Sequence, residues 1–236
     1  MQYFDVYGEA LTDYYHQRFE EELTLITNKS EREAMPVDLF FREADELPDQ
    51  ELIALALCDG KVLDVGAGAG SHSLYLQEQG MDVKALELST QACEIMRLRG
   101  VKKIVNEDIF EYQGEKFDTL LFLMNGIGLA QTLEGLKKLF EHCKTLLTPR
   151  GQLLFDTSDI DYYYSEGGIA RPTETYYGET QFQYEYKGRQ GKPFGWIYVD
   201  QQTLIRLGNE AGWVVQILDE DEHFQYLVRM EQRLNF

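Results

Sequence analysis

Residues 62–72 read Val-Leu-Asp-Val-Gly-Ala-Gly-Ala-Gly-Ser-His, and this stretch decides the fold class. An apolar run leads into three closely spaced glycines, Gly66, Gly68 and Gly70, and a helical pattern follows them. Glycines let a backbone turn sharply and approach a ligand closely. The N-terminus of a helix adds free N–H donors and a partial positive charge. The stretch therefore predicts a strand, a glycine-rich turn and a helix, with a ligand at the turn.

The alternation of apolar runs and amphipathic segments continues on both sides of this turn. It predicts an α/β fold with a mainly parallel sheet and helices on both faces. The last two strands are joined by only four acidic residues, so we expect them to be antiparallel. The expected strands are residues 61–65, 82–88, 102–105, 117–124, 151–156, 213–218 and 223–230, and the expected helices are 49–58, 70–79, 90–98, 133–147 and 200–211.

Two segments outside this core also carry patterns. Residues 8–26 have an apolar stripe at helical spacing, which predicts one amphipathic helix. Residues 180–186 and 193–199 alternate around turn-forming residues, which predicts a β-hairpin. We expect a single domain of four parts: an N-terminal helical cover (1–58), a ligand-binding core (60–156), a lid with the hairpin insertion (157–199) and a closing helix and strand pair (200–236).

Composition excludes several classes of protein. The 22 Lys and Arg residues against 41 Asp and Glu residues give a net charge of −19, and the few basic groups are scattered. A nucleic-acid partner is therefore not expected, since phosphate binding needs a basic stripe. Three distant cysteines predict neither a disulfide framework nor a metal site. No apolar run reaches the roughly 18 residues of a membrane helix, and no signal peptide is recognisable, so we expect a cytoplasmic protein.

Acidic residues accompany the glycine turn at informative positions. Asp64 precedes the first glycine, where a carboxylate repels a pyrophosphate but suits a cationic amino group or sulfonium; a purely structural role in shaping the loop is the alternative. Glu87 ends the second strand and could accept hydrogen bonds from both hydroxyls of a ribose. Asp108 and Ile109 follow the third strand and could hold an adenine. The glycine spacing is GxGxG, and Ser71 stands where the dinucleotide fingerprint GxGxxG requires glycine.

These residues together resemble the class I (Rossmann-like) S-adenosylmethionine-dependent methyltransferases. The resemblance implies a seven-stranded sheet, S-adenosylmethionine as cofactor, and transfer of its methyl group to an acceptor. It implies that the methionine part lies at the glycine turn, the ribose at Glu87, the adenine at the third strand, and the methyl group near Met124 and Asn125. The expected cofactor-binding residues are Asp64, Gly66, Ala67, Gly68, Gly70, Glu87, Leu88, Asp108, Ile109, Met124 and Asn125.

The acceptor is less defined by the sequence. Family members that methylate base amines or glutamine carry a Pro-Pro-aromatic box after the fourth strand, whereas Gly126-Ile127-Gly128 follows Asn125 here. We therefore expect a small-molecule acceptor; a protein or RNA acceptor and a non-catalytic cofactor-binding module are the alternatives. No general base is evident, and His72 and Tyr163 are the candidates. The many tyrosines could line an amine-binding pocket through cation–π contacts or pack the fold of a monomer or homodimer.

Overall fold

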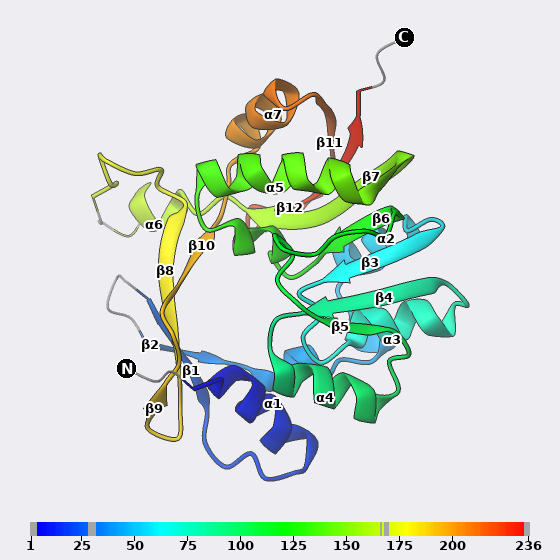
Figure 1. Ribbon diagram of the computed structural model, residues 1–236. Helices are drawn as coiled ribbons and strands as arrows, with labels where there is room; N and C mark the ends of the chain where they lie inside the picture. The colour runs from blue at the N-terminus through cyan, green and yellow to red at the C-terminus, as the bar shows by residue number, and fades with distance from the viewer. Residues whose placement is uncertain (1–3, 28–31, 166, 168–169, 234–236) are drawn as a thin grey trace. The chain divides into compact units, whose positions relative to one another are not determined.

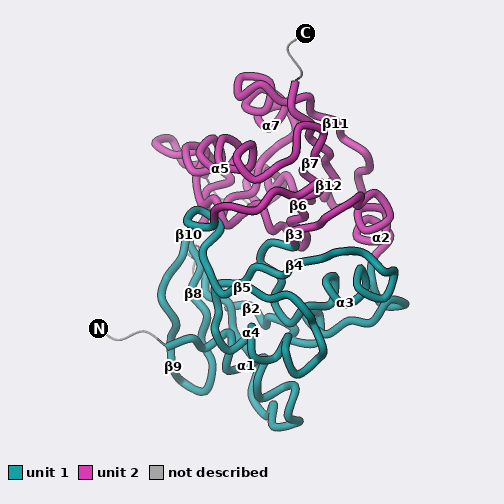
Figure 2. Tube along the Cα trace, turned by 45° about the vertical axis from the view of Figure 1, so that its right-hand side comes forward, with its two compact units in different colours: residues 1–47, 64–112, 181–194 teal, residues 48–63, 113–180, 195–236 magenta. Residues whose placement is uncertain are grey.

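The structure, a computed structural model, describes residues 4–27, 32–165, 167 and 170–233. Its elements group into two compact units, which Figure 2 colours separately. Unit 1 comprises residues 1–47, 64–112 and 181–194, and unit 2 comprises residues 48–63, 113–180 and 195–236. The chain passes between the units several times, so neither unit is a continuous stretch of sequence. The prediction of one domain in four consecutive parts stays a prediction.

A seven-stranded sheet has the strand order β11-β12-β7-β6-β3-β4-β5 (Figure 1). Strands β4 and β5 pair in parallel, as do β6 and β7, while β12 is antiparallel to both β7 and β11. The predicted fold class is therefore confirmed. The strands are β3 (Lys61–Val65), β4 (Asp82–Glu87), β5 (Ile104–Asn106), β6 (Phe117–Phe122), β7 (Leu147–Ser158), β11 (Trp213–Glu220) and β12 (Gln225–Gln232).

Three helices of unit 1 pack beside β4 and β5. Helix α3 (Ser71–Glu78) contacts β4, α4 (Thr90–Arg99) contacts both strands, and α1 (Val6–Tyr15) packs on α4. The short helices η1 (Val37–Phe40) and η2 (Ala44–Glu46) follow in the N-terminal segment. Side chains of Asp5 and Ser89 cap α1 and α4 by accepting from the backbone N–H groups of Gly8 and Ala92. These caps satisfy donors that a helix N-terminus leaves unpaired.

Unit 2 contains the other helices. These are α2 (Asp49–Ala56), η3 (Gly126–Ala130), α5 (Leu133–Leu146), α6 (Tyr162–Ser165) and α7 (Gln201–Glu210). Helix α5 packs on β7, and α7 packs on β11. Thr132 and Asp200 cap α5 and α7 by accepting from the N–H groups of Gly135 and Thr203. Strand β6 is almost fully buried because helices cover both faces of a central parallel strand.

A second sheet was not predicted. Its strand order is β10-β8-β1-β2, with β9 paired to β8. The predicted hairpin is present as β8 and β10, but it joins two N-terminal strands and does not stand alone. The strands are β1 (Leu23–Thr27), β2 (Arg32–Met35), β8 (Glu179–Tyr186), β9 (Arg189–Gln190) and β10 (Phe194–Ile197).

The prediction of one helix over residues 8–26 is wrong. The helix ends at Tyr15, Gln17 has a left-handed backbone with φ +58°, and residues 23–27 form β1. The apolar residues Leu23 and Ile26 match a helical stripe by coincidence. In β1 the buried residues are Leu23 and Leu25, which follow the two-residue period of a strand and pair with β8 and β2. Long-range pairing therefore overrides the local pattern here.

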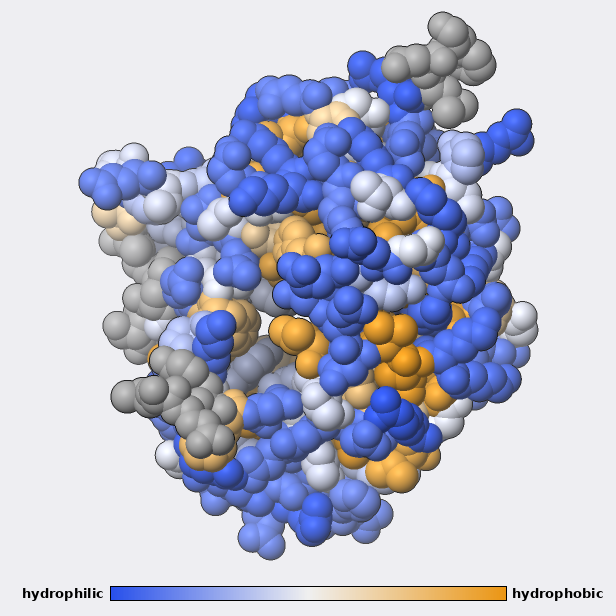
Figure 3. Space-filling model, in the orientation of Figure 1, coloured by the Kyte–Doolittle hydropathy of each residue, from blue (hydrophilic) through white to orange (hydrophobic). Residues whose placement is uncertain are grey.

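The remaining differences concern element ends. Strand β5 starts two residues later than predicted, β6 ends at Phe122, and β7 extends from Leu147 to Ser158. Within the described part of the chain, no helix is both long and apolar enough to cross a membrane. The face drawn in Figure 3 is largely hydrophilic, in keeping with the 27% of charged residues in the sequence.

Candidate functional site

The glycine turn between β3 and α3 has the backbone that its sequence requires. Gly66, Gly68 and Gly70 all have positive φ, at +72°, +57° and +88°. Side chains with a Cβ rarely adopt this conformation, so glycine is needed at each position. The N–H groups of Gly66 and Ala67 both donate to the carbonyl of Leu86, at 2.9 and 3.2 Å. The turn is therefore fastened to the end of β4.

The surroundings of the turn differ from one glycine to the next. A Cβ placed on Gly68 would lie 3.0 Å from the hydroxyl of Tyr7 and 3.4 Å from Cδ1 of Phe40. A Cβ placed on Gly66 would meet nothing within 4 Å. The turn is thus closely covered at Gly68 and open at Gly66. An open, strained backbone loop next to a helix N-terminus is a surface that a ligand can approach.

Glu87 is buried at the end of β4, and its carboxylate accepts a hydrogen bond from the glycine turn. Its Oε2 accepts from the N–H of Gly68 at 2.9 Å, and its Oε1 accepts from the N–H of Ser89 at 2.8 Å. Burial raises the pKa of Glu87, and the backbone donors partly oppose that shift. The next residue, Leu88, is 69% exposed. A carboxylate and an exposed apolar side chain therefore stand side by side at this strand end.

Asp64 lies under the turn at the end of β3. It is 2% exposed, and its Oδ2 accepts from Oγ of Ser73 in α3 at 2.7 Å. Burial raises the pKa of Asp64, while the nearby His72 and the bond from Ser73 lower it. His72 is itself buried, with 7% exposure. Asp64 therefore anchors the first turn of α3, and the structural role that the sequence left open is present.

The end of β5 lies next to Glu87. The side-chain amide of Asn106 donates to the carbonyls of Glu87 and Leu88, at 2.9 and 2.8 Å. Asp108 is exposed, and its Oδ1 accepts from the N–H of Phe110 at 3.0 Å. Ile109 is buried, with 4% exposure. Unit 1 therefore brings the glycine turn together with Asp64, Glu87, Leu88, Asp108 and Ile109.

Two aromatic residues, Tyr7 and Phe40, lie over Gly68, and Tyr184 stacks on Tyr7; we call these three rings the aromatic cap. Tyr7 meets Phe40 edge-on with ring centroids 5.2 Å apart and stacks on Tyr184 at 5.6 Å. The pKa of Tyr7 is raised well above its usual value, first by burial and then by the negative charge of Glu87.

Met124 and Asn125 belong to unit 2, in the turn after β6. Both have left-handed backbones, with φ +59° and +55°, although neither is glycine. The N–H of Asn125 donates to Oδ2 of Asp156 at 2.9 Å, and Gln225 donates to the same oxygen at 2.6 Å. Left-handed non-glycine residues cost free energy and concentrate at functional sites. The buried carboxylate of Asp156 therefore holds a strained turn at the carboxyl end of a central strand.

Asp156 is itself an unusual group. It is 1% exposed, and its Oδ1 has no hydrogen-bond partner within the described chain. Burial raises the pKa of Asp156 to about 6, and the negative charge of Glu51 adds to that shift. Sequence reasoning missed this residue because nothing in the local pattern of β7 distinguishes it from a solvent-facing acid.

Comparisons with known proteins agree with this geometry. The sequence profile of the methyltransferase domain family matches residues 63–155. A crystal structure of an S-adenosylmethionine-dependent methyltransferase from Bacteroides fragilis, in complex with S-adenosyl-L-homocysteine, is 37% identical; the alignment covers 98% of this chain and 95% of that one, with a TM-score of 0.89. This chain belongs to the S-adenosylmethionine-dependent methyltransferases.

Two curated relatives match the methyltransferase over a shorter stretch. A ubiquinone biosynthesis O-methyltransferase of Photorhabdus laumondii is 26% identical over 101 residues, 41% of this chain and 42% of the relative. A tRNA1(Val) (adenine(37)-N6)-methyltransferase of Aliivibrio fischeri is 29% identical over 118 residues, 40% of this chain and 50% of the relative. The aligned stretch spans half or less of these relatives, whose acceptors differ in kind.

The cofactor of this methyltransferase is S-adenosylmethionine. The residues of unit 1 fit it: the backbone at Gly66 is open, Glu87 is a buried carboxylate at the strand end, and Leu88 offers an exposed apolar surface. The dinucleotide alternative is not supported by these findings.

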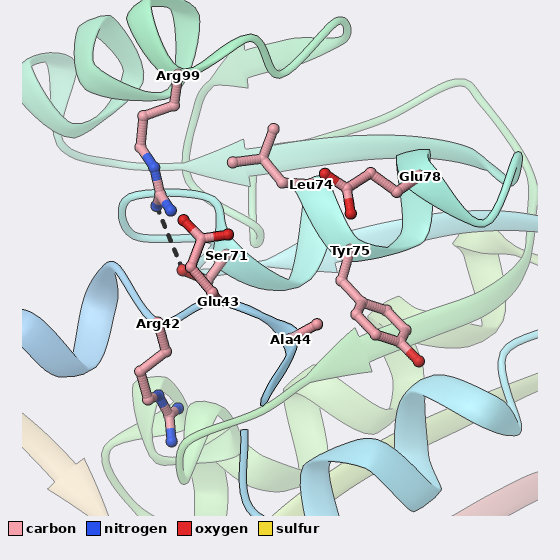
Figure 4. Close-up of a pocket in the computed structure, with 8 residues that line it drawn as sticks. All are labelled: Arg42, Glu43, Ala44, Ser71, Leu74, Tyr75, Glu78 and Arg99. Atoms are coloured by element: carbon pink, nitrogen blue, oxygen red, sulfur yellow. Dashed lines mark hydrogen bonds between the residues drawn. The ribbon is translucent and has the colours of Figure 1, made fainter. Parts of the chain in front are cut away.

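The hollow drawn in Figure 4 is a different feature of unit 1. It has a volume of about 220 Å³ and lies against the outer side of α3, where Leu74, Tyr75 and Glu78 face it. Arg42, in the loop after η1, also lines the hollow, and its Nε donates to the carbonyl of Leu39 at 2.9 Å. The glycines of the turn do not line this hollow, so it is not the cofactor cradle.

Tyr163 lies in unit 2 on the short helix α6. Its ring stacks on Tyr162 with centroids 4.5 Å apart, and both belong to the segment after β7 that the sequence predicts to be a lid. Tyr177, in the same segment, donates to Oδ1 of Asp159 at 2.6 Å. Both of these contacts lie within unit 2.

Proposed function

We propose that this methyltransferase transfers the methyl group of S-adenosylmethionine to a small-molecule acceptor. The observation that carries the proposal is the aromatic cap, which covers the glycine turn at Gly68 with the chain's own N-terminal segment. A site covered by its own chain suits an acceptor small enough to fit beneath the cover. The net charge of −19 also supports a small-molecule acceptor, since it opposes binding of a polyanionic one.

We assign the cofactor site to two groups of residues. In unit 1, Glu87 would bind the ribose hydroxyls, Leu88 and Ile109 would pack on the adenine, and Asp108 would accept from its amino group. Met124 and Asn125 lie in unit 2, and their assignment near the methyl group rests on the family resemblance of the sequence alone. The methionine part would lie along Asp64, Gly66, Ala67, Gly68 and Gly70.

The acceptor in this proposal is already nucleophilic when it binds. S-adenosylmethionine supplies a methyl group on a positively charged sulfur, which leaves as a neutral thioether when the acceptor's lone pair attacks the methyl carbon. A general base is needed only if the acceptor must lose a proton at the same time. Burial and the charge of Glu87 raise the pKa values of Tyr7 and Tyr184, so these phenols stay protonated at neutral pH. Their rings can contact the positive charge that develops on the nitrogen of a neutral amine as its lone pair takes the methyl group, which favours an amine acceptor.

Positioning would then supply most of the rate enhancement. Holding an acceptor in line with the methyl group can contribute roughly 7–11 kcal/mol. The aromatic cap is rigid, because Tyr7 packs between Phe40 and Tyr184. Rigid aromatic surfaces orient a flat or cationic acceptor at little cost in conformational entropy.

The test is methyl transfer from S-adenosylmethionine labelled in its methyl group. The purified chain is incubated with panels of small amines, phenols and carboxylates, and separately with bulk tRNA and with denatured protein. The proposal expects label in a small amine and none in tRNA or protein, and loss of that label in the Glu87→Ala variant. Label in tRNA would overturn the proposal in favour of an RNA acceptor, as the Aliivibrio relative has. A chain that binds cofactor but labels nothing would favour a non-catalytic module.

A further inference from the structure

A single arginine on α4 links the glycine turn to the N-terminal segment. Arg99 is the last residue of α4, and its Nη1 donates to the carbonyl of Ala69 at 2.8 Å, within the turn. The same guanidinium donates to the carbonyls of Phe40 and Phe41, both at 3.3 Å. These acceptors lie 30 and about 59 residues away along the chain. One side chain therefore joins three separate segments of unit 1.

The neighbours of Arg99 reinforce this link. Nη1 also donates to Oγ of Ser71 at 3.3 Å, and Ser71 in turn donates to the carbonyl of Phe40 at 3.0 Å. The guanidinium lies over the ring of Phe41, 5.0 Å from its centroid. Figure 4 shows Arg99 reaching from α4 towards Ser71, with Glu43 beside its guanidinium. Only the planar fork of arginine presents several donors in a fixed geometry.

Arg99 is half-buried. Burial lowers the pKa of Arg99, and the nearby Glu43 opposes that shift. Backbone carbonyls, which are neutral acceptors, take most of its hydrogen bonds. A half-buried charge on backbone acceptors suits a residue that sets the positions of segments.

We propose that Arg99 is a positioning residue for the cofactor: it joins the glycine turn to Phe40 of the aromatic cap, so that both meet the cofactor as one surface. Arg99 itself does not touch the cofactor in this proposal. The inference rests on the proposed assignment of the glycine turn as the cofactor cradle. It goes beyond that assignment because a residue outside the cradle then controls its affinity.

The test compares the affinity for S-adenosylhomocysteine in matched variants, by titration calorimetry well below their melting temperatures. Arg99→Gln removes the charge and the fork, and Arg99→Lys keeps only the charge. Both are expected to weaken binding by roughly tenfold or more, because a lysine offers no fork. Arg97→Gln is the control, since Arg97 lies on the same helix and forms an ion pair with the exposed Glu94. It is expected to bind like the unaltered chain.

Two further variants separate positioning from stability. Trp213→Phe should lower the melting temperature through unit 2 without changing the affinity, because Trp213 is fully buried outside unit 1. Hydrogen exchange at residues 37–41 should become faster in Arg99→Gln with the ligand bound and should not change in Trp213→Phe. Unaltered affinity in Arg99→Gln or Arg99→Lys would overturn the proposal. If Glu87→Ala also leaves the affinity unchanged, the cradle itself is wrongly assigned, which is a different failure.

Discussion

Glu87 is the residue on which the cofactor assignment depends most. Its two carboxylate oxygens each accept from a backbone N–H, of Gly68 and of Ser89. Glu87→Gln keeps the shape but replaces one acceptor by an NH₂ donor, which would face a backbone donor. Hydrogen bonds to charged groups contribute about 1.5–3 kcal/mol, so we expect S-adenosylhomocysteine to bind roughly tenfold to a hundredfold more weakly by calorimetry.

The matched control for Glu87→Gln is Glu94→Gln, because Glu94 is an exposed carboxylate on α4 that forms an ion pair with Arg97. It should bind the ligand like the unaltered chain. Equal affinities in Glu87→Gln and Glu94→Gln would mean that the strand-end carboxylate takes no part in cofactor binding.

Asp156 should leave a signature in the pH dependence of stability. Burial raises its pKa from 3.8 to about 6. The folded protein keeps this proton up to about pH 6 and the unfolded chain releases it near pH 4, so the free energy of unfolding falls as the pH rises through that window. A pKa shift of this size corresponds to roughly 3 kcal/mol of unfolding free energy. Compared with Asp156→Asn, the unaltered chain should lose about that much unfolding free energy between pH 4 and pH 7.

Denaturant unfolding at pH 4, 5, 6 and 7 measures this difference for Asp156. Asp82→Asn is the control, because Asp82 is exposed and pairs with Lys103 at the surface. The difference in unfolding free energy between Asp82→Asn and the unaltered chain should stay nearly constant from pH 4 to pH 7. Parallel pH profiles for Asp156→Asn and the unaltered chain would show that Asp156 titrates like an exposed carboxylate.

The sequence predicts only some of the residues that form the candidate site. The glycines, Glu87 and Asp108 are predicted from a local motif at fixed spacing, and their roles stay predictions. Arg97 and Arg99 lie two residues apart on the same helix, yet one forms an exposed pair and the other joins three segments. That difference depends on partners up to 59 residues away. Tyr7, Phe40 and Asp156 escaped notice for the same reason.

At the scale of elements, the N-cap of α1 connects helix stability to the site. Asp5 accepts from the N–H of Gly8 at 2.9 Å and from Oγ of Ser89 at 2.6 Å. Thr132 caps α5 in unit 2 and accepts only from the N–H of Gly135. Asp5→Ala and Thr132→Ala should each lower the unfolding free energy by about 1 kcal/mol. Only Asp5→Ala should also weaken S-adenosylhomocysteine binding, because Ser89 adjoins Glu87. Equal ligand affinities in the two variants would contradict this link.

The elements themselves were predictable where local pattern and final environment agree. Strands β3, β4 and β6 are apolar runs that become buried. Strand β1 was predicted to be helix because one of its two sheet partners is distant: β2 follows it closely, but β8 pairs with it from about 160 residues further along the chain. A second sheet built from such distant strands leaves little trace in local periodicity.

At the scale of the whole molecule, cofactor binding should appear as a gain in thermal stability. A ligand at 100 times its dissociation constant adds about 2.7 kcal/mol, which for a chain of this size corresponds to roughly 5–10 °C in melting temperature. S-adenosylhomocysteine and S-adenosylmethionine should both produce this shift. NAD should produce none, because Ser71 replaces the third fingerprint glycine and Asp64 lies under the turn. If Glu87→Gln raises the dissociation constant for S-adenosylhomocysteine well above 100 μM, that concentration of the ligand should leave the melting temperature of the variant unchanged. A shift with NAD alone would reassign the glycine turn to dinucleotide binding, whereas a shift with the two sulfur ligands alone leaves the acceptor as the remaining unknown.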